Sequence, residues 1–332
     1  MFINISFSSF VFYLVLIINF LGALVPVLLA VALLTLLERK VIGYMQFRKG
    51  PNLVGPWGLL QPIADGLKLF IKESIKPHNA SPFLFFFAPV FFFLISISLW
   101  GSMPLLVASL DFSCSLLFII VFSSLLVYAI LGAGWGSNSK YSLLGAMRGA
   151  AQAISYEVSL SLILLPLIII VGSWSLINFS GSQNSFWLVV PCFPLFLMWY
   201  ISSLAETNRA PFDLAEGESE LVSGYNVEYA GAPFALFFIG EYANIIIMNV
   251  VSVLLFFGGP SPFSNSVGGL LFMLVKSLLM IFGFLWIRSS FPRVRYDQLM
   301  MLMWKNFLPI SIGLLLFYFL VLVLLGGVAP HY

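Results

Sequence analysis

Long apolar runs dominate the chain, and short polar segments between them hold nearly all of its charge. Runs of about 20 or more apolar residues are long enough to cross a bilayer as helices, whereas a β-barrel would show short alternating segments. The pattern therefore predicts an all-α, polytopic protein with one membrane domain over residues 1–332. Its eight transmembrane helices are expected at about 10–37, 82–107, 114–133, 150–172, 186–205, 232–258, 267–287 and 307–326. Six prolines inside these spans should kink several of them, namely Pro26, Pro89, Pro104, Pro166, Pro191 and Pro194.

The polar segments carry their charge on one side. An even number of spans places both termini on the same side, and the opposite side then holds loops 38–81, 134–149, 206–231 and 288–306. These four loops contain fourteen of the fifteen Lys and Arg residues, the exception being Lys276, while the only acid of the terminal side is Asp111. This asymmetry predicts that the charged loops face the cytoplasm or the mitochondrial matrix.

Two of these loops differ in sign. The first loop, residues 38–81, holds seven basic and three acidic residues, and the acidic loop, residues 206–231, holds one basic and six acidic residues. Opposite charges on one face should bring the two loops together. Within the first loop, residues 58–73 predict an interfacial amphipathic helix with Gln61, Asp65, Lys68 and Lys72 on one face.

Composition limits the chemistry that this chain can perform alone. Charged residues make up 8% of it, against about 25% in a typical soluble domain. Two cysteines and two histidines, none of the histidines inside a span, supply no haem or iron–sulfur ligand set. The segments around Gly50 and Gly132 lack the residues that phosphate-binding loops require, so we expect no nucleotide binding. We also expect this chain to bind no metal and no nucleic acid. The uncharged first 37 residues lack the basic stretch of a signal or transit peptide, so we expect direct insertion.

Carboxylates are concentrated around the acidic loop. Seven of the thirteen acids lie within residues 206–241, at the edges of apolar runs, where ionisable groups commonly mark proton or cation paths. From the charged side, Tyr156-Glu157, Glu241 and Lys276 should lie about 10, 13 and 16 Å deep in their spans, with Glu206 at the mouth. These groups predict a staircase toward mid-membrane. The alternatives are a solvated acidic loop and buried salt bridges that only hold helices in register.

Basic and aromatic residues cluster in two other places. Glu38-Arg39-Lys40 ends the first span and begins a segment that runs to Gly50-Pro51, and Arg293 and Arg295 lie in the last loop. Anchoring to lipid headgroups is one explanation for such clusters. The Gly-Pro turn instead favours a shaped loop, and the two arginines are expected to pair with the acidic loop.

Several long motifs together resemble a known family. They are Leu36–Lys40 through Lys49–Asn52, Leu60–Lys68, Ser155–Ser159, Ala205–Asp213 and Phe291–Arg293 to Gln298-Leu299. In this order they closely resemble subunit 1 of mitochondrial NADH:ubiquinone oxidoreductase, respiratory complex I, over essentially the whole chain.

The resemblance implies a multi-pass subunit of the proton-pumping enzyme in the mitochondrial inner membrane, with termini toward the intermembrane space and charged loops toward the matrix. It implies that the charged loops form much of a quinone chamber, with ubiquinone as substrate. By the same resemblance, the quinone-binding residues would be Glu38, Arg39, Gln46, Arg48, Asp65, Lys68 and Arg293. An acidic path from the chamber toward the pumping arm would use Glu157, Glu206, Asp213, Glu216 and Glu241, with Tyr156 beside it.

Flavin and iron–sulfur clusters would then belong to partner subunits of the membrane and peripheral arms, and the isolated chain should have no redox activity. Two other functions remain open at this point. A secondary proton- or cation-coupled transporter would show internal repeats, and none is visible by eye. A purely structural membrane scaffold would tolerate neutralisation of Glu157 or Glu241 wherever it assembles.

Overall fold

The computed structural model describes residues 2–104, 113–263, 267–324 and 326, and within this part of the chain every regular element is helical. The helices are α1 (Phe2–Met45), α2 (Gln61–Ile71), α3 (Pro82–Leu99), α4 (Ser115–Ser137), α5 (Lys140–Val171), α6 (Leu176–Ser182), α7 (Phe193–Glu206), α8 (Glu218–Leu221), α9 (Ala232–Phe256), α10 (Val267–Ser290), α11 (Tyr296–Met301) and α12 (Leu308–Leu324). Short 3₁₀ turns lie at Pro56–Gly58, Trp100–Ser102 and Gly224–Asn226, and a π-helical turn lies at Leu302–Phe307.

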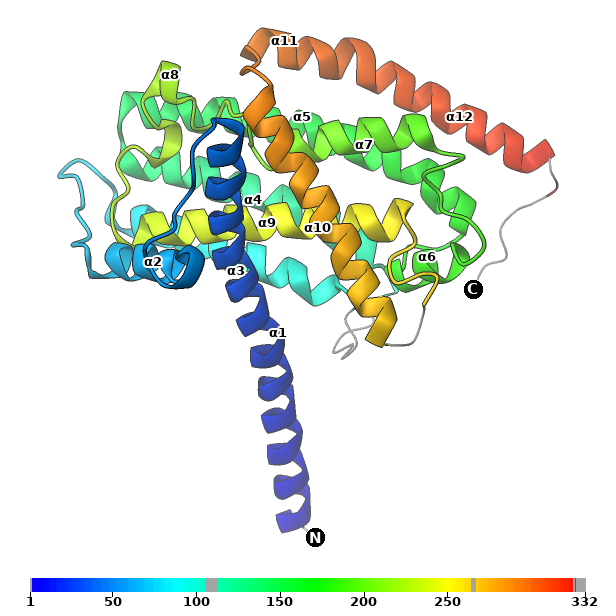
Figure 1. The fold of residues 1–332 in the computed structure, drawn as a ribbon, viewed down its shortest axis with the longest axis horizontal. Coiled ribbons are helices and arrows are strands. Elements are labelled where there is room, and N and C mark those ends of the chain that lie inside the picture. The colour runs from blue at the N-terminus through cyan, green and yellow to red at the C-terminus, as the bar shows by residue number, and fades with distance from the viewer. Residues whose placement is uncertain (1, 105–112, 264–266, 325, 327–332) are drawn as a thin grey trace.

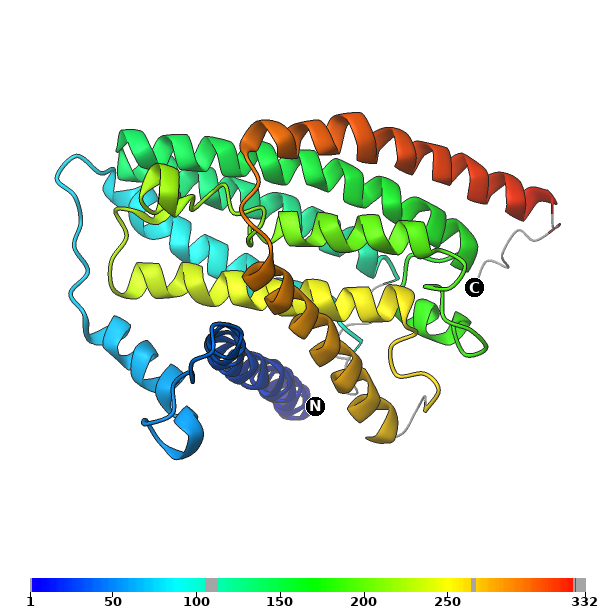
Figure 2. The ribbon, with the colours of Figure 1, turned by 45° about the horizontal axis from the view of Figure 1, so that its top comes forward.

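The long helices form a bundle. Helices α3, α4, α5, α7 and α9 run alongside one another, α10 crosses them, and α12 follows α5 (Figures 1 and 2). The C-terminal half of α1 packs against α9 and α10, while its N-terminal half extends away from the bundle (Figure 1). The start of α3, the end of α4, and the starts of α5 and α9 meet at one end, together with α2 and α8 (Figure 1). Several of the predicted charged segments therefore gather in one place.

Six helical segments of the described chain are long and apolar enough to cross a membrane: Pro82–Ser102, Ser115–Ser137, Lys140–Val171, Ala232–Phe256, Gly268–Ser290 and Tyr296–Leu324. They confirm six of the predicted spans in position and the class of multi-pass helical membrane protein. The first predicted span falls within α1, so the count of eight stays a prediction. Residues 105–107 and 325 of two predicted spans, and Asp111, lie outside the described residues.

Three predicted boundaries are wrong. Helix α5 begins at Lys140 rather than near residue 150, so the predicted loop 134–149 shrinks to a turn in which Asn138 has a left-handed φ of 51°. The last span begins at Tyr296 instead of 307. The fifth predicted span is shortened to α7, whose 14 residues rise only about 21 Å, less than the hydrocarbon thickness. Charged and glycine-containing helical turns lack the apolar signal from which the boundaries were predicted.

The expected proline kinks are also partly wrong. Pro26, Pro89 and Pro166 do lie inside helices. Pro194 instead occupies the first turn of α7, where its missing N–H costs no hydrogen bond. Pro104 follows the turn that ends α3, and Pro191 precedes α7. These last three therefore mark helix ends.

Small residues explain why the polar start of α5 is helical. A Cβ on Gly134 would lie 2.2 Å from that of Ala146, so α4 and α5 approach closely only because a hydrogen stands there. A Cβ on Gly145 would lie 2.8 Å from the Cα of Gly224. Gly224 itself has a φ of 56°, and a Cβ there would lie 1.7 Å from the carbonyl oxygen of Ala215. The acidic loop is thus seated directly on the first turns of α5.

The amphipathic helix of the first loop is confirmed as α2, and Gln61 donates a 3.0 Å hydrogen bond to Asp65 along its polar face. The first loop and the acidic loop approach each other closely at Gly231, where a Cβ would meet the carbonyl of Lys72 at 2.8 Å. The ion pairs of the acidic loop are made elsewhere, with Arg148 and Arg293 and within the loop's own surroundings. The expectation that opposite net charge draws the two loops together stays a prediction.

Candidate functional site

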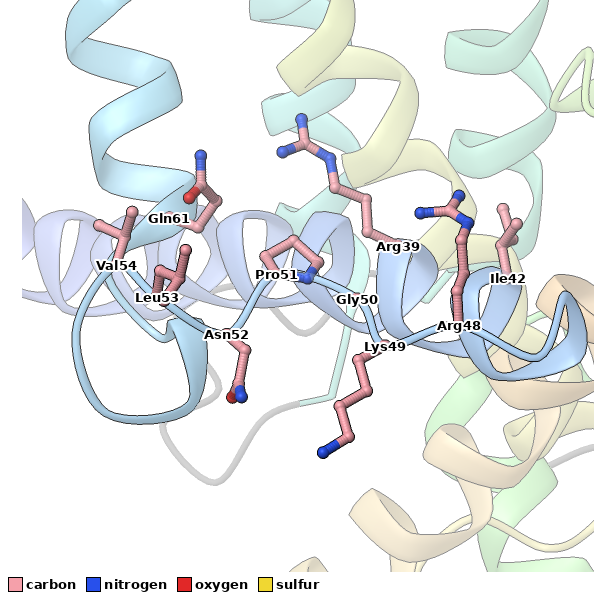
Figure 3. Close-up of a pocket in the computed structure, with 10 residues that line it drawn as sticks. All are labelled: Arg39, Ile42, Arg48, Lys49, Gly50, Pro51, Asn52, Leu53, Val54 and Gln61. Carbon is pink, nitrogen blue, oxygen red and sulfur yellow. The ribbon is translucent and has the colours of Figure 1, made fainter.

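A pocket of about 680 Å³ lies where the first loop folds back beside the end of α1 (Figure 3). Ten residues line it: Arg39, Ile42, Arg48, Lys49, Gly50, Pro51, Asn52, Leu53, Val54 and Gln61. The volume falls within the range of about 300–1,000 Å³ that is usual for small-molecule sites. All ten lining residues come from the end of α1, the first loop and the start of α2. The acidic loop, which was expected to help close the chamber, contributes none of them.

Polar contacts order the residues around this pocket. Arg39 pairs with Asp65 at 2.5 Å, which ties α1 to α2. The Arg48 Nε donates a 3.0 Å hydrogen bond to the Gln46 side chain. In Figure 3, Arg39 and Gln61 point to one side of the loop, and Lys49 and Asn52 point to the other. Four of the seven residues that the resemblance assigned to quinone binding (Arg39, Gln46, Arg48 and Asp65) therefore lie in or beside one pocket.

The other three lie apart from it. Lys68 is exposed on α2. Glu38 is 6% exposed and faces the bundle, where it pairs with Arg288 and accepts a 2.7 Å hydrogen bond from Tyr242 of α9. Arg293 contacts Asp213 at 3.1 Å, which confirms the expected pairing of the last loop with the acidic loop. Sequence neighbours such as Glu38 and Arg39 thus face two different environments, because successive helical residues point about 100° apart.

The acidic loop buries a cluster of like charges. Asp213 accepts a hydrogen bond from the backbone N–H of Glu216, and the Asn226 amide donates to Glu216 at 3.1 Å. Burial, together with the nearby carboxylates of Glu241 and Asp213, raises the pKa of Glu216 to about 8 against the opposing charge of Arg209. Burial also raises the pKa of Asp213 above its ordinary value, although Arg293 opposes the rise. Glu216 therefore holds a proton near neutral pH.

Glu241 lies at the centre of this cluster. Its side chain is 11% exposed, accepts a hydrogen bond from the Tyr225 hydroxyl, and lies 3.7 Å from the Arg209 guanidinium. The Arg209 guanidinium also covers the ring of Tyr242, with 4.3 Å between its Cζ and the ring centroid. The lone arginine of the acidic loop is thus the buried counter-charge for the acids around it.

Three small cavities lie beside the acids of α5, α7 and α9. One of 20 Å³ is lined by Glu157 and Glu206, and one of 30 Å³ by Glu206, Asn244 and Glu241. A third, of 30 Å³, is also lined by Glu206. Each has room for about one water molecule. Glu206 thus lines every cavity in the series, which places it between Glu157 and Glu241.

Two groups of the predicted staircase lie elsewhere. Lys276 donates hydrogen bonds of 2.7–3.0 Å to the carbonyls of Phe257, Gly259 and Ser261, just beyond the C-terminus of α9. From Glu241 to Phe257 the helical rise is about 24 Å, so its expected place in the staircase is wrong. Tyr156 is fully buried, and its hydroxyl lies 3.5 Å from the carbonyl of Leu299, away from the cavities that Glu157 and Glu206 line.

Sequence reasoning missed residues that hold this arrangement together. Gln152 of α5 is fully buried and donates two 2.7 Å hydrogen bonds, to the carbonyls of Ala205 and Phe212, which fix both sides of the turn after α7. Arg209 could have been found as the single cation among six acids, and Gln152 as an amide inside an apolar span. Among the described residues there is no cluster of three or more His, Cys, Asp or Glu that could hold a metal.

Residues 18–319 match the family described as NADH dehydrogenase. The chain belongs to this family. It is 59% identical to NADH-ubiquinone oxidoreductase chain 1 of Paracentrotus lividus over 96% of this chain and 99% of that relative. The protein of the same name from Oncorhynchus mykiss is 58% identical over 95% and 98%, and that from Patiria pectinifera is 56% identical over 97% and 98%. The resemblance inferred from the motifs is therefore confirmed.

Proposed function

We propose that this chain is a membrane-arm subunit of proton-pumping NADH:ubiquinone oxidoreductase in the mitochondrial inner membrane. The observation that carries the proposal is the match to relatives of that name, at 56–59% identity, over nearly the full length of both chains. NADH oxidation, the flavin and the iron–sulfur clusters belong to partner subunits, and this chain contributes the site where quinone meets the membrane. Its charged loops face the matrix.

The pocket of the first loop is the quinone site in this proposal. Arg39, Arg48 and Lys49 supply cationic donors, while Ile42 and Leu53 supply apolar surface for an isoprenoid tail. Quinone carbonyl oxygens accept hydrogen bonds, and a reduced head carries negative charge that fixed cations stabilise. The Arg39–Asp65 pair holds one of these cations in place.

The acidic cluster carries charge away from that site. Glu216 and Asp213 form its outer part beside Arg293, Glu241 its centre, and Glu206 its junction with Glu157. A carboxyl group that exchanges a proton with a water in one cavity can release it to a water in the next. Cavities with room for about one water each limit the transfer to these side chains, so the protons follow the carboxyl groups in order.

A photoreactive ubiquinone tests the site. In the assembled enzyme we expect label on residues 38–73, and unlabelled ubiquinone should compete it away. The pocket also predicts that Arg48→Gln reduces labelling more than Lys72→Gln, since Lys72 lies outside the lining residues. Labelling confined to the segments that connect the helices at the other end of the bundle would defeat both the site and the topology.

A further inference from the structure

Tyr242 touches both halves of the proposed mechanism. It is 5% exposed and belongs to α9, next to Glu241 in sequence. Its hydroxyl donates a 2.7 Å hydrogen bond to Glu38 of α1, and the face of its ring lies 4.3 Å from the Arg209 guanidinium. Glu38 adjoins the pocket-lining Arg39, and Arg209 is the counter-charge of Glu241. One side chain therefore joins Glu38, the sequence neighbour of a pocket-lining residue, to Arg209 of the acidic cluster.

The geometry leaves Arg209 able to move. Its Nη2 lies 3.7 Å from the Glu241 carboxylate, too far for a hydrogen bond. Its Nε and Nη2 are buried without a hydrogen-bond partner. A guanidinium held by a ring face and by charge, with spare donors, can tighten onto Glu241 or withdraw from it when the ring shifts. The contact to the ring is worth roughly 0.5–2 kcal/mol, small enough to change during turnover.

Glu38 is the group that would move the ring. Its two carboxylate oxygens are divided between Arg288 and Tyr242. A change of charge in the pocket alters the balance of these two contacts, because Arg288 is partly exposed whereas the tyrosine is enclosed. The hydroxyl follows the carboxylate, and the ring carries Arg209 with it.

We propose that Tyr242 is a positioning residue that transmits the charge state of the quinone pocket, sensed at Glu38, to the Arg209–Glu241 pair. This inference rests on the proposed function. Tyr242 is absent from the lining of the quinone pocket and of the cavities beside Glu206. It acts through its two neighbours: the hydroxyl donates to Glu38, and the ring lies against the Arg209 guanidinium.

Two substitutions test the hydroxyl and the ring in turn. Tyr242→Phe removes the hydroxyl and keeps the ring, and Tyr242→Leu removes both. In assembled enzyme we expect Tyr242→Phe to lower the kcat of quinone reduction about tenfold and to leave the KM for a short-chain quinone within twofold, since the lost hydrogen bond is to a carboxylate outside the pocket lining. Tyr242→Leu should lower kcat at least threefold further. Proton release per electron pair is measured on the same membranes.

Tyr200→Phe is the matched control. This tyrosine is also packed in the bundle, and its hydroxyl lies 3.5 Å from the carbonyl of Met280, in contact with neither acid. Its loss should leave kcat unchanged. Quinone reduction is normalised to assembled complex, so reduced abundance with normal turnover in Tyr242→Phe would show a structural role and overturn the inference.

Glu38→Gln distinguishes this inference from the function on which it rests. If Glu38→Gln lowers turnover while Tyr242→Phe does not, the link through the tyrosine is wrong and the proposed function stands. If neither substitution affects turnover per assembled complex, both this inference and the role in quinone binding that the resemblance assigned to Glu38 are refuted. A rise in KM with unchanged kcat in Tyr242→Phe would place the residue in pocket shape and also overturn transmission.

Discussion

Glu241→Gln perturbs the centre of the acidic cluster with the least change in shape. The amide keeps the hydrogen bond from Tyr225 as an acceptor, but it removes the titrating group and the charge 3.7 Å from Arg209. Protons that follow the carboxyl groups would have no carrier between Glu216 and Glu206. Quinone reduction coupled to proton release should therefore fall while the complex still assembles.

The structure sets the expected size of two effects of Glu241→Gln, the loss of stability and the loss of turnover. Removing one partner of a buried ion pair usually costs about 3–5 kcal/mol. Arg209 keeps the carboxylate of Asp213 nearby, so we expect the loss of stability at the lower end, about 3 kcal/mol. Loss of a positioned proton carrier lowers rates by about 100-fold or more.

The assay compares two quantities on the same membranes: the amount of assembled complex and the quinone reductase rate. Glu220→Gln is the matched control, since it makes the same substitution in the acidic loop. Its pair with Arg148 is 2.5 Å long but exposed, with 36% and 49% of the side chains accessible, so it contributes less than about 1 kcal/mol. Normal turnover per assembled complex in Glu241→Gln, with abundance alone reduced, would refute the relay and favour a structural role for this acid.

Two further predictions follow from the neighbouring residues. Because the pKa of Glu216 is raised from 4.5 to about 8, the folded state holds a proton across this window that the unfolded chain has released, and stability should fall as pH rises through it. Glu216→Gln should therefore reduce the loss of stability with rising pH, measured by heat inactivation from pH 6 to 9. It should also reduce any decrease of the turnover rate near pH 8. Unchanged pH profiles would contradict the raised pKa of Glu216. Gln152→Leu leaves two buried carbonyls without donors, so it should destabilise the complex by about 2–6 kcal/mol. Thermal inactivation measures the effect, and Gln152→Glu or the exposed Gln46→Leu serves as the comparison.

Apolar periodicity was sufficient to predict the helical class and the positions of six spans, because each of these segments is long and apolar enough to be recognised without its neighbours. Apolar periodicity predicted the wrong boundary where a helix continues through polar residues. The first turns of α5 contain Lys140 and Arg148, yet they remain helical because glycine at 145 fits against Gly224. That contact joins residues far apart in the sequence, so no local signal reports it.

The site shows the same division. The motifs indicated candidate acids and cations, but not how these residues pair. Net charge suggested that the first loop would bind the acidic loop, whereas Asp213 pairs with Arg293 and Glu38 turns inward to Tyr242. The direction in which a side chain points from its backbone decides which partner it meets. Lys276 was assigned to the staircase from its depth alone, and depth without the position of the facing helix end could not reveal that it binds the carbonyls after α9.

The unpartnered polar atoms around Glu206 bear on how the path operates. Glu206 Oε2, Asn208 Oδ1 and Asn244 Oδ1 are buried without a protein partner, and all three residues line the cavity shared with Glu241. Buried polar atoms without partners are rare and are usually satisfied by water. A cavity of 30 Å³ has room for about one such molecule, so a single water can serve several of these oxygens. In the proposed path, transfer between Glu241 and Glu206 would depend on one water and on the orientation of Glu241, which lies 3.7 Å from Arg209 and accepts a hydrogen bond from Tyr225. A substitution that shifts Arg209 would then affect this path more than one that widens the cavity.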